Sequence, residues 1–246
     1  MKIGVQLYTV RDVMEKDPWL GLEKLSQIGF RSVEMAGLHD RSAEEWAENL
    51  QRFGLEAVSS HCMLSDLEND LDGVVNQAKL LGYRYIVCPW VAEEEYANGW
   101  PVLAARLNEI GKRLFDEDIT FAYHNHDFEF AKVGTETGLD QIFKNTNSSY
   151  VVAELDVFWA QFAGFDPGPM IVSMAGRIPL VHFKDMDMDR KFTEVGAGIL
   201  DWDEIIESAH AAGAEYAIIE NDQPSIDSME SVAASREFLL RSGLSD

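Results

Sequence analysis

The sequence predicts a (β/α)8 barrel that spans residues 1–246 as a single domain, and three observations support this. Eight short β-rich runs recur along the chain, and their starts lie roughly 25 to 40 residues apart, about the length of one strand–helix unit. Helical patterns fill the intervals without a linker-like stretch, which favours a barrel over a doubly wound sheet. No GxGxxG motif follows the first run, so a dinucleotide-binding fold is disfavoured.

The eight predicted strands are rich in β-branched and aromatic residues. In chain order they cover residues 2–8, 30–36, 55–62, 83–90, 119–126, 150–159, 178–185 and 216–222. Helices are predicted between them, among others over residues 18–29, 42–54, 70–82 and 201–213. Each of these four segments ends in a glycine shortly before the next strand, as expected for the C-cap of a helix.

Composition and charge argue against several classes of function. The formal net charge is -23 over 246 residues, so the chain should repel nucleic acids and anionic membrane surfaces. No apolar run approaches the roughly 20 residues of a membrane span. The two cysteines, Cys62 and Cys88, form no CxxC motif and resemble reduced packing residues, which indicates a cytoplasmic protein. A homo-oligomer is compatible with the sequence.

Alternation along the later strands places polar side chains inside the predicted barrel. The odd-numbered positions of residues 151–157 are all apolar and should face the helices, so Glu154 and Asp156 point inward. On three other strands the same alternation directs three pairs of side chains inward: His124 and His126, His182 and Lys184, and Glu220 and Asp222. Earlier strands add Gln6, Glu34 and His61. The polar residues lie near carboxyl ends of strands, where barrel enzymes have their active sites.

This constellation predicts a metal site. Carboxylates buried together are costly unless a cation or protons compensate them, and imidazole with carboxylate suits a divalent ion such as Mn²⁺, Co²⁺ or Zn²⁺, with Mg²⁺ possible. The expected ligands, one from each of four strands, are His124, Asp156, His182 and Glu220. The alternative is a metal-free network of ion pairs among the acids, Lys184 and protonated histidines.

At these residues the chain resembles the sugar phosphate isomerase/epimerase family of xylose isomerase-like TIM barrels, which includes ketose 3-epimerases, inosose dehydratases and endonuclease IV-type enzymes. The segments that carry the resemblance span the chain: "GVQLYTVRD", "YHNHDFEF", "ELDVFW", "VHFKD", "TEVGAGILDW" and "IIEND". The family's metal set is Glu, Asp, His and Glu on strands five to eight. The last three positions match Asp156, His182 and Glu220, whereas His124 stands at the fifth-strand position.

The resemblance implies a metal-dependent sugar or keto-sugar isomerase or epimerase that works through an enediolate, with a small sugar or polyol as substrate. Glu220 and Glu154 would transfer protons, and Lys184 would stabilise negative charge. Trp159 stands where the epimerases carry a substrate-binding histidine. The residues expected to contact substrate are Gln6, Glu34, His61, Trp90, Glu129, Trp159 and Glu194, the last of these on a loop over the mouth at residues 193–202.

Two other functions remain open. A lyase would expel water from an inosose, or a glycosyl oxygen from a 3-keto-glycoside, with His126 or Glu129 as general acid. A sugar-binding protein without catalysis would bind ligand without turnover. An abasic-site endonuclease is disfavoured by the strong acidity and the lack of a basic groove.

Overall fold

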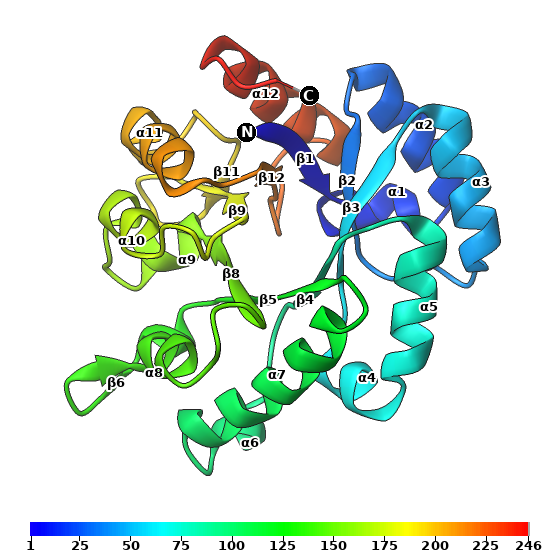
Figure 1. The fold of residues 1–246 in the computed structure, drawn as a ribbon. Coiled ribbons are helices and arrows are strands. Elements are labelled where there is room, and N and C mark those ends of the chain that lie inside the picture. Colours follow the sequence, from blue (N-terminus) through cyan, green and yellow to red (C-terminus); the bar gives the residue numbers. More distant parts are fainter. Residues whose placement is uncertain (246) are drawn as a thin grey trace.

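Eight parallel strands close into a barrel in the computed structural model, which describes residues 1–245 (Figure 1). The order around the barrel is β1-β12-β9-β8-β5-β4-β3-β2, so barrel strands that follow one another along the chain are neighbours. Their bounds are Lys2–Gln6 (β1), Ser32–Met35 (β2), Glu56–His61 (β3), Tyr85–Cys88 (β4), Thr120–His124 (β5), Val151–Asp156 (β8), Leu180–Phe183 (β9) and Tyr216–Ile219 (β12). The predicted (β/α)8 barrel is therefore confirmed.

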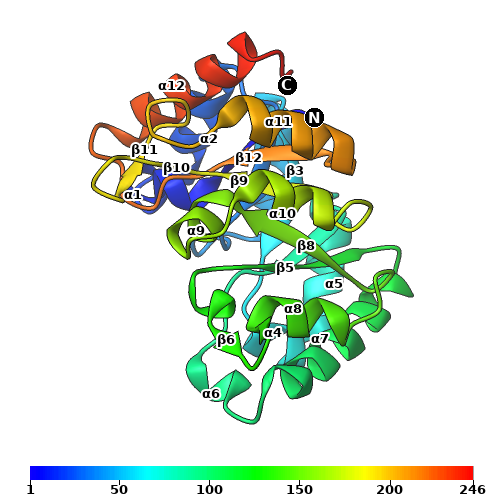
Figure 2. The same cartoon turned by 90° about the vertical axis from the view of Figure 1, so that its left-hand side faces the viewer.

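Helices surround the barrel, as the view along it and the view from the side show (Figures 1 and 2). The α-helices are Arg11–Met14 (α1), Pro18–Ile28 (α2), Ala43–Phe53 (α3), Leu64–Asn69 (α4), Leu71–Leu81 (α5), Glu93–Tyr96 (α6), Trp100–Phe115 (α7), Gly138–Lys144 (α8), Val157–Phe162 (α9), Pro167–Ser173 (α10), Trp202–Ala212 (α11) and Ser228–Arg241 (α12). Two 3-10 helices are Leu7–Val10 (η1) and Phe128–Phe130 (η2). Two short hairpins pair Lys132–Val133 (β6) with Glu136–Thr137 (β7), and Asp185–Met186 (β10) with Phe192–Thr193 (β11).

The apolar core has two parts, one on each face of the barrel wall. The outer part packs strands against helices and includes Val151, Ala153 and Leu155, as the alternation predicts. The inner part fills the barrel with Val58, Tyr85, Val87, Ala122, Val152, Leu180, Tyr216 and Ile218. Since these residues close the interior, the barrel is a packed core and the polar inward residues lie above it, at the carboxyl ends of the strands.

The predicted helix ends are confirmed. Gly29, Gly54, Gly82 and Gly213 are the C-caps of α2, α3, α5 and α11, all in the left-handed conformation that glycine adopts without strain. Asp201 caps α11 at its other end, accepting a hydrogen bond from the backbone N–H of Glu204 at 3.1 Å.

Several predicted strands end earlier than expected: β1 ends at Gln6, where the 3-10 helix η1 follows, and β12 ends at Ile219. The sixth barrel strand, β8, shows the reason most clearly. The run over residues 150–159 was expected to stay extended, but β8 ends at Asp156 and α9 begins at Val157. The reason is a cap: Asp156 Oδ1 accepts a hydrogen bond from the backbone N–H of Trp159 at 3.0 Å. Trp159 therefore lies on a helix rather than on the strand. Within residues 1–245, no helix is long and apolar enough to cross a membrane.

Candidate active site

A cavity of about 680 Å³ opens at the carboxyl ends of the barrel strands. It is lined by Tyr8, Arg11, Ala36, Gly37, His61, Met63, Asp66, Pro89, Trp90, His124, His126, Lys184, Glu220, Asp222 and Gln223. This is the face on which the sequence predicts the site, and six of the expected polar residues line the cavity: His61, His124, His126, Lys184, Glu220 and Asp222.

The four expected metal ligands lie together beside this cavity. Each of His124, Asp156, His182 and Glu220 offers one donor atom, and these atoms all lie within 4.8 Å of one another. All four residues are buried. Asp156 Oδ2 makes no hydrogen bond among the described residues, and the cation that compensates it is the ammonium of Lys184 at 3.1 Å. The donor set of two imidazoles and two carboxylates fits a borderline divalent ion.

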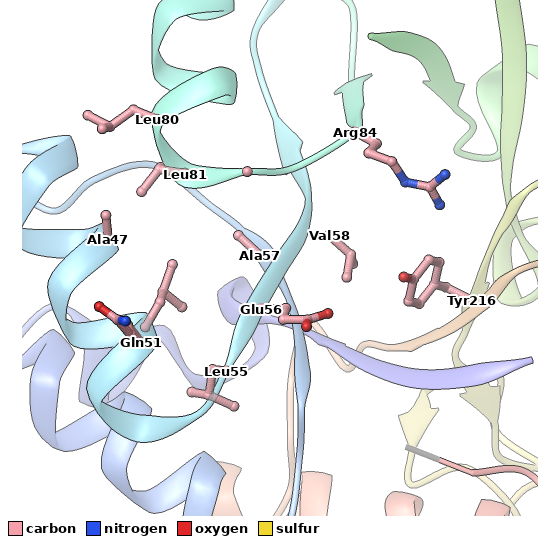
Figure 3. Close-up of a pocket in the computed structure, with 12 residues that line it drawn as sticks. Ala47, Gln51, Leu55, Glu56, Ala57, Val58, Leu80, Leu81, Arg84 and Tyr216 are labelled. Carbon is pink, nitrogen blue, oxygen red and sulfur yellow. The ribbon is translucent and has the colours of Figure 1, made fainter. Parts of the chain in front are cut away.

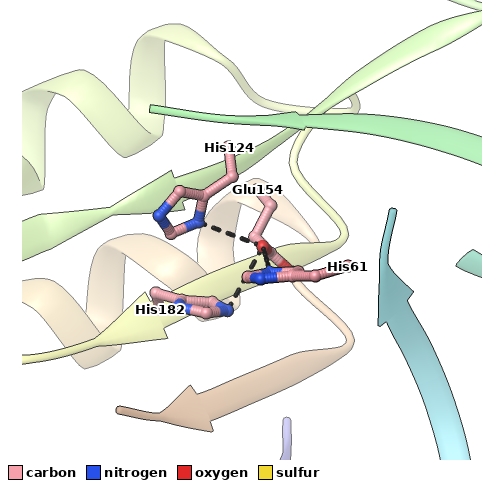
Figure 4. Close-up of side chains that lie close together, drawn as sticks. All are labelled: His61, His124, Glu154 and His182. Atoms are coloured by element: carbon pink, nitrogen blue, oxygen red, sulfur yellow. Dashed lines mark hydrogen bonds and ion pairs between the residues drawn. The ribbon is translucent and has the colours of Figure 1, made fainter. Parts of the chain in front are cut away.

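A second group of side chains meets beneath these ligands. The imidazoles of His61, His124 and His182 converge on one oxygen of Glu154 (Figure 4). Glu154 Oε2 lies 3.0 Å from His61 Nε2, 3.1 Å from His124 Nδ1 and 3.2 Å from His182 Nε2. Glu154 is fully buried and does not line the cavity, so the histidines lie between its carboxylate and the mouth.

His124 and His182 link the two groups through opposite ring nitrogens. His182 Nδ1 lies 2.8 Å from Glu220 Oε2, while its Nε2 lies 2.7 Å from Glu34 Oε1. For His124, Nε2 lies 3.7 Å from Asp156 Oδ2 and Nδ1 faces Glu154. An imidazole that donates one N–H to a carboxylate presents its other nitrogen to a metal in a fixed tautomer.

Lys184 is the cation that faces these acids in the described structure. Its Nζ lies 3.1 Å from Asp156 Oδ2, 2.9 Å from Glu220 Oε2 and 2.8 Å from Asp222 Oδ2. Burial would lower the pKa of Lys184, but the three carboxylates outweigh it and hold the pKa well above its ordinary value. This arrangement supplies part of the ion-pair network that the sequence offers as the alternative to a metal.

The charges of the histidines differ according to their neighbours. Burial would lower the pKa of His61, but Glu34 and Glu154 outweigh burial and raise it to about 10. The pKa of His182 is also raised, again because carboxylates outweigh burial. Burial lowers the pKa of His124 well below its usual range and that of His126 to about 3, so both imidazoles are neutral. A divalent ion bound to His182 would instead favour the neutral form of its imidazole, because a coordinating imidazole is neutral.

The other expected substrate contacts fall into two sets. Trp90 lines the cavity, and Trp159 packs its ring 5.4 Å from that of His126, with Lys184 Nζ 5.8 Å from the Trp159 centroid. Gln6 and Glu34 are fully buried, and Gln6 Nε2 donates to Glu34 Oε1 at 2.8 Å. They therefore support the histidines rather than line the mouth.

Glu129 and Glu194 lie elsewhere than expected. The buried carboxylate of Glu129 accepts hydrogen bonds from the Tyr123 hydroxyl at 2.8 Å and from the backbone N–H of His126 at 2.9 Å. It does not line the cavity, because Tyr123 faces the outer core and holds Glu129 there. Glu194 is half-buried and accepts a hydrogen bond from the Thr193 hydroxyl at 3.3 Å. It does not line the cavity either.

The sequence interpretation missed Asp185, which organises the loop after β9. Its carboxylate accepts five hydrogen bonds, from the backbone N–H groups of Met186, Gly196, Gly198 and Leu200 and from Trp202 Nε1. Gly198 is required here, because a Cβ at that position would lie 2.2 Å from the carbonyl oxygen of Met186. The glycines of "TEVGAGILDW" were a signal of such a tight loop, but they did not identify its acceptor.

A second cavity, of about 550 Å³, lies at the amino ends of the strands between α3 and α5 (Figure 3). Its lining is mostly apolar, and its two charged residues are Glu56 and Arg84. Arg84 is paired with Glu215 at 2.6 Å. The titratable cluster therefore belongs to the opposite end of the barrel.

Comparisons with known proteins agree with this geometry. The family model described as "Xylose isomerase-like TIM barrel" matches residues 22–242. An inosose dehydratase of Geobacillus kaustophilus is 25% identical over 192 residues, which is 68% of this chain and 62% of that protein. One from Clostridium beijerinckii is 30% identical over 90 residues, which is 37% of this chain and 30% of that protein. The matches thus span less than two thirds of both curated relatives.

Solved structures show the same fold. A sugar phosphate isomerase/epimerase from Parabacteroides distasonis superposes with a TM-score of 0.86 at 22% sequence identity. That similarity covers 98% of this chain and 94% of the other.

Proposed function

Because the chain belongs to the xylose isomerase-like TIM-barrel family, we propose that it is a divalent-metal-dependent enzyme that isomerises or epimerises a sugar or keto-sugar. The observation that carries this proposal is the convergence of His124, Asp156, His182 and Glu220, whose donor atoms lie within 4.8 Å of one another beside the 680 Å³ cavity. A divalent ion held there would polarise a substrate carbonyl and the neighbouring hydroxyl.

The residues that line the cavity would carry the proton transfers. Glu220 takes the proton from the carbon next to the carbonyl, and His126, which is neutral, exchanges a proton on the other side of the substrate. The ammonium of Lys184 stabilises the negative charge that develops on the enediolate oxygen. All three side chains line the cavity, which supports these roles.

Glu154 was expected to transfer protons, and we assign it a supporting role instead. It is fully buried beneath three imidazoles, so it orients His124 and His182 rather than touching the substrate. Glu34 acts on His182 in the same way.

A second candidate is a lyase that removes water from an inosose, and the observation that favours it is the similarity to inosose dehydratases. Both reactions begin with the same proton abstraction, so the same residues serve both. Cytoplasmic location, the single domain and a homo-oligomer stay predictions.

The test is incubation of metal-loaded protein with keto-sugars and inososes in deuterium oxide, followed by mass spectrometry. Incorporation of one deuterium without loss of water supports the isomerase or epimerase. A product lighter by one water supports the lyase. Binding without exchange or product would contradict both and leave a sugar-binding protein.

A further inference from the structure

The large apolar side chains of the cavity gather on one side of the barrel mouth. The opposite side carries titratable side chains from segments at the ends of β5, β9 and β12, such as His124, Lys184 and Glu220, and we call it the acidic half. Three further titratable residues, Arg11, His61 and Asp66, line the cavity from the first half of the chain. The large apolar side chains come from segments that follow β1, β3 and β4: Tyr8, Met63 and Trp90. We call these three residues, with Ala36 and Pro89, the apolar shelf.

The apolar shelf is unusually exposed. Tyr8, Met63 and Trp90 keep 47%, 42% and 43% of their surface accessible, although each is large enough to be buried in a core. Single exposed apolar residues are ordinary, but several that line one cavity next to convergent polar groups mark a ligand-binding surface. The shelf is therefore continuous with the proposed active site and lies within reach of the same ligand.

The cationic side chains that line the cavity already have described partners, and His61 lies within 3.1 Å of Glu34 and Glu154. Asp66, Glu220 and Asp222 all line the cavity, and Lys184 is already shared among three carboxylates. Arg11 donates from both terminal nitrogens to the carbonyl oxygens of Tyr8, at 2.8 Å, and Asp222, at 2.6 Å. Its guanidinium also lies 4.2 Å from the Tyr8 ring centroid. Arg11 thus links the apolar shelf to the acidic half. Both of its terminal nitrogens already donate hydrogen bonds, so they are not free to bind a phosphate group.

We propose that the substrate is an uncharged keto-glycoside whose sugar ring, which carries the carbonyl, lies over the acidic half and whose apolar aglycone lies on the apolar shelf. A cavity of about 680 Å³ falls within the range that holds drug-sized ligands, so it has room for a second ring beyond the sugar. Trp90 and Tyr8 supply flat apolar surfaces for that ring. This inference rests on the proposed function, since it takes the acidic half to be the reacting half.

The test is calorimetric titration of metal-loaded protein with unreactive probes. Methyl and phenyl β-D-glucopyranoside, and the same pair of galactosides, differ only in the aglycone within each pair. We expect the phenyl glycoside of at least one pair to bind about tenfold more tightly than its methyl partner, from the apolar area it buries. The further probes are myo-inositol and glucose 6-phosphate.

Two variants locate the effect. Trp90→Ala should weaken phenyl glycoside binding by about tenfold and leave methyl glycoside binding within about twofold. Phe115→Ala is the control, because Phe115 is an aromatic residue with 53% exposure at the end of α7 and does not line the cavity. It should leave both affinities unchanged.

Equal affinity for the methyl and phenyl members of both pairs, or tighter binding of myo-inositol or glucose 6-phosphate, overturns the inference. Absence of binding by every glycoside overturns it too. The proposed function fails separately: a phenyl preference that depends on Trp90, without metal binding or deuterium exchange, supports the shelf and contradicts the enzyme. Deuterium exchange without a phenyl preference supports the enzyme and contradicts the inference about the apolar shelf.

Discussion

His182 Nε2 lies 2.7 Å from Oε1 of Glu34, although the two residues are on β9 and β2 and stand 148 positions apart in the chain. The contact crosses the interior of the barrel, above the apolar core. It leaves Nδ1 of His182 directed at Glu220, on the side where the proposed metal ion binds. Glu154 Oε2 lies 3.2 Å from the same nitrogen, so two buried carboxylates together select which nitrogen of His182 is left for the proposed metal ion.

Replacement of Glu34 by Gln should weaken metal binding by about 10- to 100-fold, because His182 Nε2 loses the nearer of its two charged acceptors, at 2.7 Å, and keeps only Glu154 at 3.2 Å. The measurement is the dissociation constant of Mn²⁺ or Co²⁺ by calorimetry, together with the circular dichroism of both proteins. Glu56→Gln is the control, since Glu56 is exposed at the start of β3. Affinity within about twofold of the native protein would show that Glu34 does not position His182.

Asp156→Ala and His182→Ala should each abolish metal binding and turnover, because each removes one of the four proposed ligands. Elemental analysis of protein purified without a chelator or a metal-affinity tag measures the metal content per chain. Asp66→Ala is the matched control, since Asp66 lines the same cavity but is not one of the ligands. Retained metal stoichiometry in both ligand variants would refute the assignment.

Glu154→Gln should still bind a metal ion supplied in excess, because all four proposed ligands remain, but should bind it more weakly and lose most of the activity. The expected fall in kcat is about 100-fold, since the amide cannot accept from three imidazoles as the carboxylate does. Steady-state rates and metal content are measured on the same preparation. Native rates in this variant would remove Glu154 from the mechanism.

Asp185→Asn should lower the free energy of unfolding by about 3 kcal/mol, because its side-chain amide would face N–H donors that the carboxylate now satisfies. Urea denaturation measures the change. Asp189→Asn, exposed at the tip of the same hairpin, should change stability by less than about 0.5 kcal/mol. Equal stability of the two variants would mean that Asp185 does not hold the loop.

Glu129 should make stability depend on pH. Burial raises the pKa of Glu129 to about 7 from the ordinary 4.5, so the folded protein keeps a proton that the unfolded chain has lost. The contribution of this group to stability therefore falls as pH rises between these two values, and it stays constant outside them. We expect the stability of the native protein relative to Glu129→Gln to be lower at about pH 8 than at about pH 5. The same difference at both pH values would contradict this.

Much of the site could be predicted because a barrel strand has only two faces. Once Val151, Ala153 and Leu155 are assigned to the outer core, Glu154 and Asp156 have to point inward. Alternation does not reveal how deep in the barrel an inward side chain lies or which residues it contacts. Glu154 lies one pleat below Asp156, and its contacts with His61 and His182 depend on how the strands are staggered around the barrel.

Local side-chain hydrogen bonds explain the other differences between the predicted and the observed structure. The sequence pattern places Asp156 on a strand, but its carboxylate also caps a helix. The hydrogen bond that it accepts from the Trp159 backbone N–H ends β8. Glu129 follows the polar run "YHNHD" and was expected at the mouth, yet its bond to the Tyr123 hydroxyl draws it toward the outer core. In both places a single side-chain hydrogen bond decided the outcome, and the pattern of polar and apolar residues does not encode it.

The division of the mouth also bears on how such a protein can diverge. The apolar shelf is encoded entirely before α7, whereas His124, Lys184 and Glu220 are encoded entirely after it. Glu34 and His61 also precede α7 but contact His182 and Glu154, so the first half of the gene also encodes part of the support for the metal ligands. Substitutions confined to the three large shelf residues can therefore change ligand preference without touching that support. Recombination between related genes within the codons for α7 would preserve the chemistry only where both parents carry Glu34 and His61, and such chimaeras would take their metal ligands from one parent and their choice of ligand from the other.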